Sequence, residues 1–429
     1  MPAPLPPSPL LRATDLFALA LAAGADDAAL VRLDDPALDE DRPFILAAMP
    51  HAKTLLVLVA RMNREAVRSP QRSIANLEFH QTGEQLDHAA RQIVRQLEDQ
   101  GVPALNPAMA FPMEMEQFPK RMWIVSHKRA AEAAGLGRIG LHRNLIHPRY
   151  GSFVLLNTLL LGVDVDQVGT PLAENPCFEC KLCVAACPVG AIKPDGYFDF
   201  STCFTHNYQQ FMGGFATWIE DVVESKNRAD YHRRVPYAET VTRWQSLSYK
   251  PNYNAAYCVA VCPAGTEVIP PYQQDKADHL RRVVKPLQDK PETLYVVKGS
   301  DAAQSVPKRF PHKTIRWVRQ PLRVETIEIF LRGLPLLFQP GQAGSLDATY
   351  HFTFTGREPQ HATIILRNRR VTCQPGHHGQ PTLRVTADSV SWCRFLNKEL
   401  SIPKAILTGR IRLKGSPKWM IAFAKCFPV

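Results

Sequence analysis

The chain has 429 residues, of which 45% are hydrophobic and 21% are charged. This length exceeds that of one ordinary domain, and this composition is globular, so extended disorder and fibrous architectures are excluded. The net charge of +11 would suit a surface for nucleic acid, anionic lipid or an acidic electron donor. We favour a solvated basic face, because the sequence has no run of five basic residues.

The first 110 residues or so alternate between helical and strand-like segments. The stretch from Thr14 to Leu30 is rich in alanine and leucine and is predicted to be helical. Lys53 to Ala60 is a continuous apolar run, typical of a strand that is covered on both faces. A capping box formed by Thr82 and Gln85 predicts the start of another helix, and Gly101 predicts its end. We therefore expect an α/β layer here.

Nothing in the sequence predicts export or a membrane span. The longest apolar run, from Phe153 to Val163, contains Asn157 and is shorter than the ~20 residues that a spanning helix needs. The amino terminus lacks the basic region of a secretory signal. Seven of the ten cysteines lie in the middle of the chain, where cluster ligation explains them better than disulfides. We expect a cytoplasmic protein, in which Cys373, Cys393 and Cys426 are small buried hydrophobes.

A glycine-rich stretch follows an alanine-rich segment at residues 130–140. Gly135, Gly137 and Gly140 have the spacing of a dinucleotide-binding fingerprint. They close a helix-like segment rather than following a strand and opening a helix, so the dinucleotide interpretation fails. Glycines at these positions would instead let the backbone approach a flat cofactor or a neighbouring element. The turn Tyr150-Gly151-Ser152-Phe153 comes soon after.

The most specific motif lies at residues 177–188, which read Cys-Phe-Glu-Cys-Lys-Leu-Cys-Val-Ala-Ala-Cys-Pro. This is the spacing of bacterial ferredoxins, whose thiolates hold an iron–sulfur cube. Cys177, Cys180 and Cys183 can wrap one cluster, while Cys187 opens a helix that points away. A structural zinc site is the alternative, but such sites usually place two cysteines together and two further off. We predict a [4Fe–4S] cluster.

The glycine segment, the Tyr150–Phe153 turn and the cysteine run, in this order, resemble the epoxyqueuosine reductases and, more distantly, the reductive dehalogenases. The resemblance covers residues from about 40 to 270. It implies a nitroreductase-like α/β core that binds base-off cobalamin, and two [4Fe–4S] clusters that pass electrons to cobalt. The cofactor-binding residues that it implies are Gly135, Gly137, Gly140, Tyr150, Gly151 and Ser152. The chain contains no Asp-x-His-x-x-Gly cobalamin motif.

The resemblance also implies two sets of cluster ligands. The first set is complete and consists of Cys177, Cys180, Cys183 and Cys262. The second set is one thiolate short and consists of Cys187, Cys203 and Cys258, because Ala255 stands where the family has cysteine. A non-cysteine ligand such as His206, a [3Fe–4S] cluster, or loss of the second cluster would each reconcile the count.

The proton donor of the family has no counterpart here. Epoxyqueuosine reductases carry an acidic residue about a dozen positions before the alanine–glycine segment, and residues 120–128 contain no carboxylate. His127 and Lys128 are the candidate catalytic residues that remain. The alternative is that both are solvated side chains before a helix.

After residue 206 the chain is predicted to hold an insertion, a linker and, over its last hundred or so residues, a separate unit. Residues 207–252 form an aromatic-rich insertion of the kind that makes lids, and 273–285 a short basic helix. A strand–helix–strand linker follows up to Val318. A helix at Leu322–Leu337, strands at 348–354, 362–366 and 382–385, and an apolar tail after Trp419 are similar in order to the sterol carrier protein fold. That similarity implies an apolar ligand tunnel, with docking or dimerisation as the alternative.

We therefore expect an α/β core at residues 1–165, a ferredoxin-like two-cluster domain at 166–270, a linker at 271–319 and an α+β sterol-carrier-like domain at 320–429. The predicted function is a cobalamin-dependent iron–sulfur reductase of an apolar small molecule or lipid, with reduced ferredoxin or flavodoxin as donor. Transfer RNA is not expected as a substrate, because epoxyqueuosine reductases usually end otherwise. The alternative is a non-catalytic electron-transfer protein that has a lipid-binding module and no cobalamin.

Overall fold

The computed structural model describes residues 10–115 and 121–428. The chain divides into two compact units, which we describe separately. The first unit consists of Met1–Ala186 and Ala256–Asp289, and the second of Cys187–Ala255 and Lys290–Val429. This division runs through the predicted ferredoxin-like domain, whose boundaries stay a prediction. No helix among the described residues is long and apolar enough to cross a membrane.

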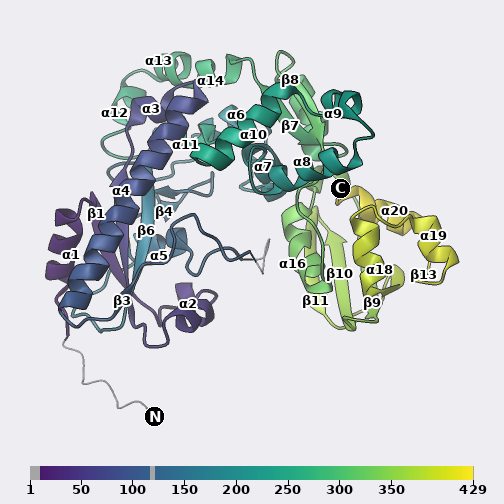
Figure 1. The fold of residues 1–429 in the computed structure, drawn as a ribbon, viewed down its shortest axis with the longest axis horizontal. Coiled ribbons are helices and arrows are strands. Elements are labelled where there is room, and N and C mark those ends of the chain that lie inside the picture. Colours follow the sequence, from purple (N-terminus) through teal and green to yellow (C-terminus); the bar gives the residue numbers. More distant parts are fainter. Residues whose placement is uncertain (1–9, 116–120, 429) are drawn as a thin grey trace, which may run out of the picture. The chain divides into compact units, whose positions relative to one another are not determined.

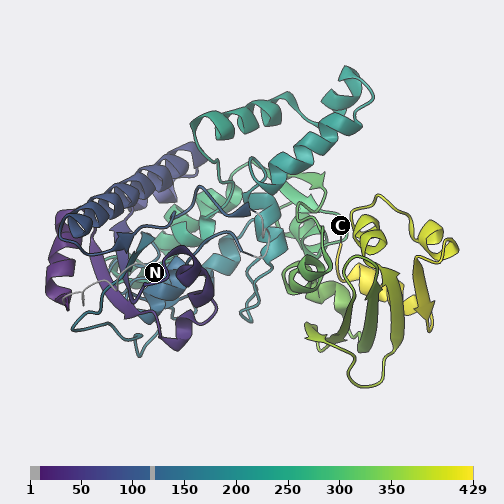
Figure 2. The same ribbon diagram turned by 60° about the horizontal axis from the view of Figure 1, so that its bottom comes forward.

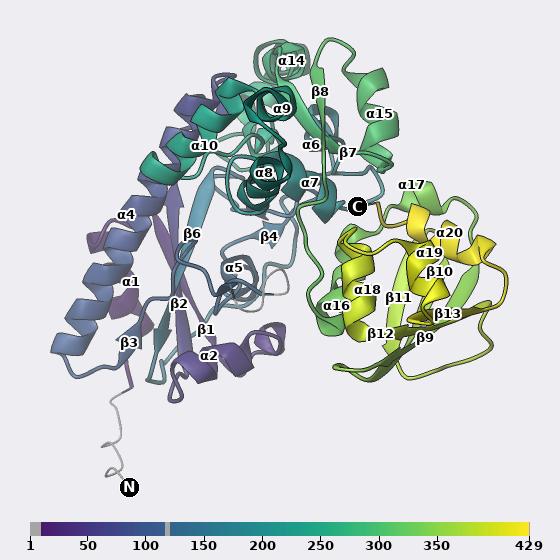
Figure 3. The same ribbon diagram turned by 45° about the vertical axis from the view of Figure 1, so that its right-hand side comes forward.

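The first unit is built on a four-stranded antiparallel sheet in the order β1-β2-β6-β3. Its strands are β1 (Asp27–Arg32), β2 (Thr54–Arg61), β6 (Val154–Leu161) and β3 (Ala104–Leu105). Helices α1 (Ala13–Ala22) and α4 (Arg72–Asp99) cover one face, and α2 (Arg42–Ala48) and α5 (His127–Ala133) the other (Figures 1 and 3). Strand β2 is buried on both faces, as its continuous apolar sequence predicted.

Two predicted helix boundaries in this unit are wrong. The helix expected over Thr14–Leu30 ends at Ala22, because the chain turns at Gly24, whose φ is +104°, and then pairs with β2 as strand β1. Thr82 is not a helix cap but lies in the middle of α4, where its hydroxyl bonds the Glu78 carboxylate. The end of that helix is where Gly101 predicted it, since Gly101 adopts the left-handed conformation that stops a helix.

Short elements complete the first unit. A two-stranded hairpin, β4 (Arg138–Ile139) and β5 (Leu145–Ile146), follows α5. Helices α3 (Arg64–Arg68), α6 (Leu182–Ala186) and α11 (Tyr257–Ala260) meet in one hydrophobic cluster. The basic helix expected over 273–285 forms as a series of short segments: α12 (Pro270–Gln274), α13 (Lys276–His279), the π-helical turn η3 (Leu280–Val284) and α14 (Lys285–Asp289).

The second unit begins with helices where the sequence predicted a long insertion. They are α7 (Phe200–Asn207), α8 (Gly213–Glu224), α9 (Arg228–Arg234) and α10 (Tyr237–Tyr249). The predicted strand–helix–strand segment is confirmed as β7 (Thr293–Val297), α15 (Asp301–Arg309) and β8 (Thr314–Val318), with β7 and β8 parallel.

The chain ends in a five-stranded sheet with the order β11-β10-β9-β12-β13 (Figure 2). Its strands are β9 (Ala348–Thr355), β10 (Gln360–Arg367), β11 (Arg370–Pro375), β12 (Leu383–Asp388) and β13 (Ile411–Lys414). The helices that go with it are α16 (Ile327–Leu337), α17 (Pro340–Ala343), α18 (Ser389–Leu396), α19 (Ile402–Leu407) and α20 (Lys418–Lys425). The sequence missed β11, and α16 starts five residues later than predicted because Thr326 caps it.

Aromatic side chains fill the space between this sheet and its helices. Phe352 contacts the rings of Phe330 on α16, Trp392 on α18 and Phe423 on α20. Tyr350 also contacts Phe423. These rings occupy the middle of the layer in which the sequence predicted an apolar tunnel. A groove of about 580 Å³ lies instead between α16 and strands β10 and β11, and charged Glu328 and Arg332 are in its lining.

Candidate metal centre

Five cysteines gather in the first unit, at the contact between α6 and α11. Burial raises the pKa of the Cys183 thiol, and four neighbouring thiols raise it further; they are those of Cys258, Cys262, Cys180 and Cys177. Burial, together with Cys180 and Cys177, also raises the pKa of the Cys262 thiol to about 12. Such thiols become good ligands only when a cation replaces their protons. The donor set therefore fits an iron–sulfur cluster.

The backbone around these cysteines is held in conformations that L residues rarely adopt. Glu179 and Lys181 have φ values of +52° and +62°, and Ala256, which precedes α11, has a φ of +74°. Each such residue costs of order 1 kcal/mol, and strain of this kind concentrates at functional sites. Residues 177–183 thus fold as the tight loop that the cysteine spacing predicted. The proximity of both Cys258 and Cys262 to Cys183 leaves open which of them is the fourth ligand.

Within the described residues, no group of three or more His, Cys, Asp or Glu side chains could hold a single metal ion. A cluster of several irons spreads its thiolates over separate corners, so the five neighbouring thiols suit such a cluster. The choice between iron–sulfur and zinc stays a prediction from the sequence.

The turn at Tyr150–Phe153 braces the second cysteine segment. The Ser152 hydroxyl donates to the Val259 carbonyl at 3.0 Å. Gly151 has a φ of +66°, and a Cβ there would lie 2.0 Å from the Ala264 carbonyl oxygen. The Tyr150 ring stacks on His147 at 4.8 Å between ring centroids. The structure thus gives Tyr150, Gly151 and Ser152 a role in holding α11, and their predicted contact with a cofactor stays a prediction.

The three glycines near residue 140 lie against neighbouring backbone. A Cβ on Gly135 would approach the Thr170 carbonyl oxygen to 2.4 Å, and one on Gly137 the Ile146 carbonyl oxygen to 2.4 Å. A Cβ on Gly140 would meet the Ile146 side chain at 2.5 Å. Close approach to Thr170 and to Ile146 of β5 therefore accounts for these glycines without a cofactor, which was one of the two explanations that the sequence left open.

The two predicted proton donors differ in their surroundings. The His127 ring accepts a hydrogen bond from the Thr158 hydroxyl at 3.0 Å and, in that tautomer, donates to the Ala108 carbonyl at 3.3 Å. Burial lowers the pKa of His127 to about 4, so its ring is neutral at pH 7 and is a poor acid. Lys128 is exposed, and its ammonium donates to the Arg143 carbonyl at 3.0 Å and to Asn144 Oδ1 at 2.7 Å.

Two residues that the sequence analysis did not single out connect Lys128 to the cysteines. His142 is 4% exposed; its Nδ1 accepts from the Asn144 backbone N–H at 3.1 Å, and its Nε2 is buried without a hydrogen-bond partner. Burial, together with nearby Lys128, lowers the pKa of His142 to about 4. Asn144 Nδ2 lies 3.9 Å from Cys258 Sγ. A buried ring nitrogen without a partner marks a place where a bound group would find one.

Cys187 and Cys203, the two predicted cluster ligands in the second unit, lie in different settings. Cys187 Sγ accepts from the Ala191 backbone N–H at 3.2 Å, and Cys203 lies on α7 near Tyr208. His206, suggested as a non-cysteine ligand, accepts a hydrogen bond at Nδ1 from the Tyr295 backbone N–H. Its Nε2 is buried and has no hydrogen-bond partner among the described residues, and its role as an iron ligand stays a prediction. The composition of a second cluster stays a prediction.

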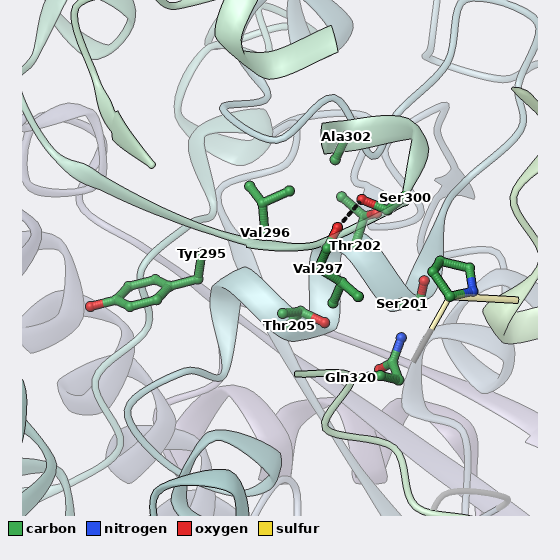
Figure 4. A pocket seen from close by; sticks show the side chains of 10 residues that line it. Ser201, Thr202, Thr205, Tyr295, Val296, Val297, Ser300, Ala302 and Gln320 are labelled. Atoms are coloured by element: carbon green, nitrogen blue, oxygen red, sulfur yellow. Dashed lines mark hydrogen bonds between the residues drawn. The ribbon is translucent and has the colours of Figure 1, made fainter. Parts of the chain in front are cut away.

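A small cavity of about 10 Å³ lies between α7 and β7 (Figure 4). Thr205 on α7 and Tyr295 on β7 are in its lining, and beside them the Ser300 hydroxyl donates to the Val297 carbonyl at 2.7 Å. A space of this size holds one water molecule, whereas small-molecule sites occupy about 300–1,000 Å³. This cavity is therefore not a substrate site.

The remaining three cysteines behave largely as the sequence predicted. Cys393 and Cys426 are buried, and burial raises the pKa of each thiol to about 11. Cys373 is only half-buried, because it lies on β11 and lines the groove beside α16. All three come more than a hundred residues after Cys262 in the sequence. They provide controls for tests of cluster ligation.

Comparisons with known proteins agree with two expectations from the sequence. Residues 339–428 match the model of the SCP-2 sterol transfer family. An epoxyqueuosine reductase of Aliivibrio fischeri is 30% identical over 145 residues, which are 28% of this chain and 38% of the relative. The match thus spans less than two fifths of that relative.

Two solved structures are also similar to the chain. One is an epoxyqueuosine reductase with an epoxyqueuosine-modified tRNA stem loop, 16% identical with a TM-score of 0.37, covering 70% of this chain and 81% of that chain. The other is a catabolic reductive dehalogenase, 15% identical with a TM-score of 0.39, covering 63% and 34%. The sequence match and the family model together show a chain that is similar to the epoxyqueuosine reductases and carries a sterol-carrier-like segment at its carboxyl end.

Proposed function

We propose that this protein is a cobalamin-dependent iron–sulfur reductase. The proximity of Cys177, Cys180, Cys183, Cys258 and Cys262 to one another carries the proposal. Sequence similarity to epoxyqueuosine reductases favours a reductase over the non-catalytic electron-transfer alternative. Bound iron–sulfur clusters would supply one-electron transfer, and a bound corrinoid would supply a cobalt able to reduce a substrate.

The chain's own residues would hold and shield these groups. Cys177, Cys180, Cys183 and Cys262 would ligate the first [4Fe–4S] cluster, and Cys187, Cys203 and Cys258 would contribute to a second cluster. Ser152 and Gly151 keep the α11 segment in place. Burial of the thiols excludes water, which slows loss of the cluster and tunes its potential.

A corrinoid would lie where His142 leaves a buried nitrogen without a partner. Asn144 and Lys128 form the polar connection from this point to the exterior. Of the two predicted proton donors, the geometry favours Lys128, because its ammonium carries a proton at pH 7 and His127 does not. Lys128 would hold a proton at Nζ for transfer to substrate.

The substrate and partners belong to this proposal as well. The sterol-carrier-like segment supports an apolar substrate or lipid, for which the groove beside α16 offers space. Reduced ferredoxin or flavodoxin would be the donor. The prediction that transfer RNA is not a substrate gains no support from the comparisons, because one similar structure contains a tRNA stem loop.

The proposal can be tested by the metal content of Cys183→Ser. Anaerobic protein reconstituted with iron and sulfide should show the visible absorption of an iron–sulfur cluster, with more than about four irons per chain if two clusters form. Cys183→Ser should lose the first cluster and the absorption that this cluster gives. The control Cys393→Ser should keep the first cluster and its absorption. Equal iron and unchanged spectra in the two variants would refute the ligand assignment.

Cobalamin binding needs its own measurement. Cob(II)alamin added to the reconstituted wild-type protein should change its spectrum as the base dissociates, and His142→Ala should weaken that binding. If wild-type protein with full iron content leaves the cobalamin spectrum unchanged, the electron-transfer alternative replaces the reductase.

A further inference from the structure

The positive charge of the chain is concentrated at its carboxyl end. Residues 339–428 contain 13 Lys and Arg against 4 Asp and Glu, a net charge of +9 out of +11 for the whole chain. The remaining 339 residues share a net charge of +2. The segment also has four of the 14 histidines. A charge this unevenly distributed points to a local surface rather than to general solubility.

The alternation of the strands places three of these cations, Arg384, Arg412 and Lys414, on one face of the five-stranded sheet. Leu383, Val385 and Ala387 of β12 are buried against the helices, so Arg384 and Thr386 point to the opposite, outer face. Figure 2 shows this sheet beside its helices. On β13, Ile411 is buried and Arg412 and Lys414 are exposed.

Strand register places the basic side chains in adjacent rows. Arg384 pairs with His351 of β9 on one side and with Lys414 of β13 on the other. In the next row, Thr386 pairs with Arg412 and with Thr353. Side chains that are paired across strands in this way lie roughly 5 Å apart on the same face.

The cations of this face are not neutralised by the protein. In the described part of the chain, Arg384, Arg412 and Lys414 form no ion pair, whereas Arg367 at the edge of the sheet is paired with Asp347 at 2.8 Å. Uncompensated charges so close together repel one another and favour a polyanionic partner.

Imidazole rings lie beside these cations. His351 and His377 are stacked, with ring centroids 4.5 Å apart and planes 3° apart, and His361 contacts the His377 ring at 4.8 Å. The His377 ring is fixed by a hydrogen bond from Nε2 to the Phe352 carbonyl at 2.9 Å. His361 and His377 are exposed, so they present flat rings on which a nucleobase can stack.

The composition of this face favours nucleic acid over a membrane. Large exposed hydrophobic side chains of the segment lie on the helices, at Val390, Ile406, Leu407 and Ile421, and among the described residues none lies on the outer sheet face. Membrane binding is strengthened by buried apolar side chains. A flat sheet with cations, hydroxyls and planar rings is instead the kind of platform that binds single-stranded nucleic acid.

We propose that the outer face of the carboxyl-terminal sheet, centred on Arg384, Arg412 and Lys414, binds single-stranded nucleic acid. The cations contact phosphates, the threonine hydroxyls donate hydrogen bonds, and His361 and His377 stack on bases. This binding requires neither the clusters nor a corrinoid, so it stands or falls independently of the proposed reductase activity.

The test uses full-length protein and a fluorescein-labelled single-stranded RNA of mixed sequence, followed by fluorescence anisotropy over a range of salt concentrations. R384E/R412E/K414E should bind at least about tenfold more weakly at low salt, and the slope of log Kd against log salt should fall by about 2, as loss of three phosphate contacts implies. The matched control K404E/K418E/K425E changes the same charge on α19 and α20 and should keep the wild-type slope.

Three outcomes would overturn the proposal. Equal losses in the two triple variants would show that net charge, and not this face, drives binding. Wild-type protein that sediments with phosphatidylserine vesicles but does not bind the RNA would assign the face to a membrane. If circular dichroism shows that R384E/R412E/K414E is unfolded, R384Q/R412Q/K414Q replaces it, and an unchanged salt slope in that variant also refutes the proposal.

Discussion

The two sheets of this protein differ in how many of their faces are covered. Strand β2 of the first sheet is buried over Thr54–Ala60, with Leu55 and Val57 facing one helical layer and Leu56 and Leu58 the other. Strands β9 and β12 of the second sheet alternate, with aromatic or aliphatic residues toward the helices and Thr, His or Arg on the outer face. A continuous apolar strand thus marks a structural layer, and an alternating strand leaves a face available for a partner.

The functional residues follow the same division. In the first unit, the buried sheet supports loops on which cysteines and glycines are packed at close range. In the second unit, the sheet itself presents the charged side chains. Chemistry in the first unit therefore depends on tight packing, and recognition in the second on exposed charge.

The largest expected effect is a loss of stability in variants of neighbouring residues on β2 and on β12. These variants test whether both faces of a strand are covered or only one. Leu55→Ala and Leu56→Ala each remove a fully buried side chain on opposite faces of β2, so both should lower the free energy of unfolding by about 2–5 kcal/mol. In β12, Leu383→Ala should cost a similar amount, whereas its neighbour Arg384→Ala should change stability by less than about 0.5 kcal/mol. Urea denaturation followed by circular dichroism measures all four.

A smaller loss of stability is expected from replacing two glycines that both have a left-handed backbone conformation. Gly151 has a φ of +66° and lies against the Ala264 carbonyl, while Gly379 has a φ of +70° and nothing within 4 Å of an added Cβ. Gly379→Ala should cost about 1 kcal/mol from conformation alone. Gly151→Ala should cost more and should also lower the iron content after reconstitution, because α11 must move. Similar losses of stability at both positions would argue against the bracing role of the turn.

The smallest effect concerns the pH dependence of stability. His127 takes up a proton near pH 6.5 in the unfolded chain but only near pH 4 when folded, because burial lowers its pKa. The unfolded state therefore binds more protons between these values, so stability is full above pH 6.5 and falls as the pH drops toward 4, by up to about 1.4 kcal/mol per pH unit.

His127→Gln removes this group, so the difference in bound protons between the unfolded and folded states should fall by up to one, and the plot of unfolding free energy against pH should become flatter. The measurement is the unfolding free energy at several pH values between 4 and 7, compared with wild-type protein. A variant whose slope matches that of the wild type would show that His127 is accessible to protons in the folded protein.

The sequence by itself determined the features that depend on local pattern. The apolar run at Lys53–Ala60 predicted a strand covered on both faces, and the spacing of Cys177, Cys180 and Cys183 predicted a tight loop, both of which the structure has. The order of segments was enough to indicate the resemblance to epoxyqueuosine reductases and the sterol-carrier-like end, both of which the comparisons confirm. Each of these signals lies within a few neighbouring residues or in their order along the chain.

Only the tertiary structure decided what depends on contacts between distant segments. The expected helix over Thr14–Leu30 became half strand, because pairing with β2 outweighs helix propensity. The glycines at 135 and 137 lie against neighbouring backbone and Gly140 lies against the Ile146 side chain, and His142 was found only through its unpartnered buried nitrogen. The +11 charge had no visible cluster in the sequence, because Arg384, Arg412 and Lys414 are separated along the chain and meet only through strand register.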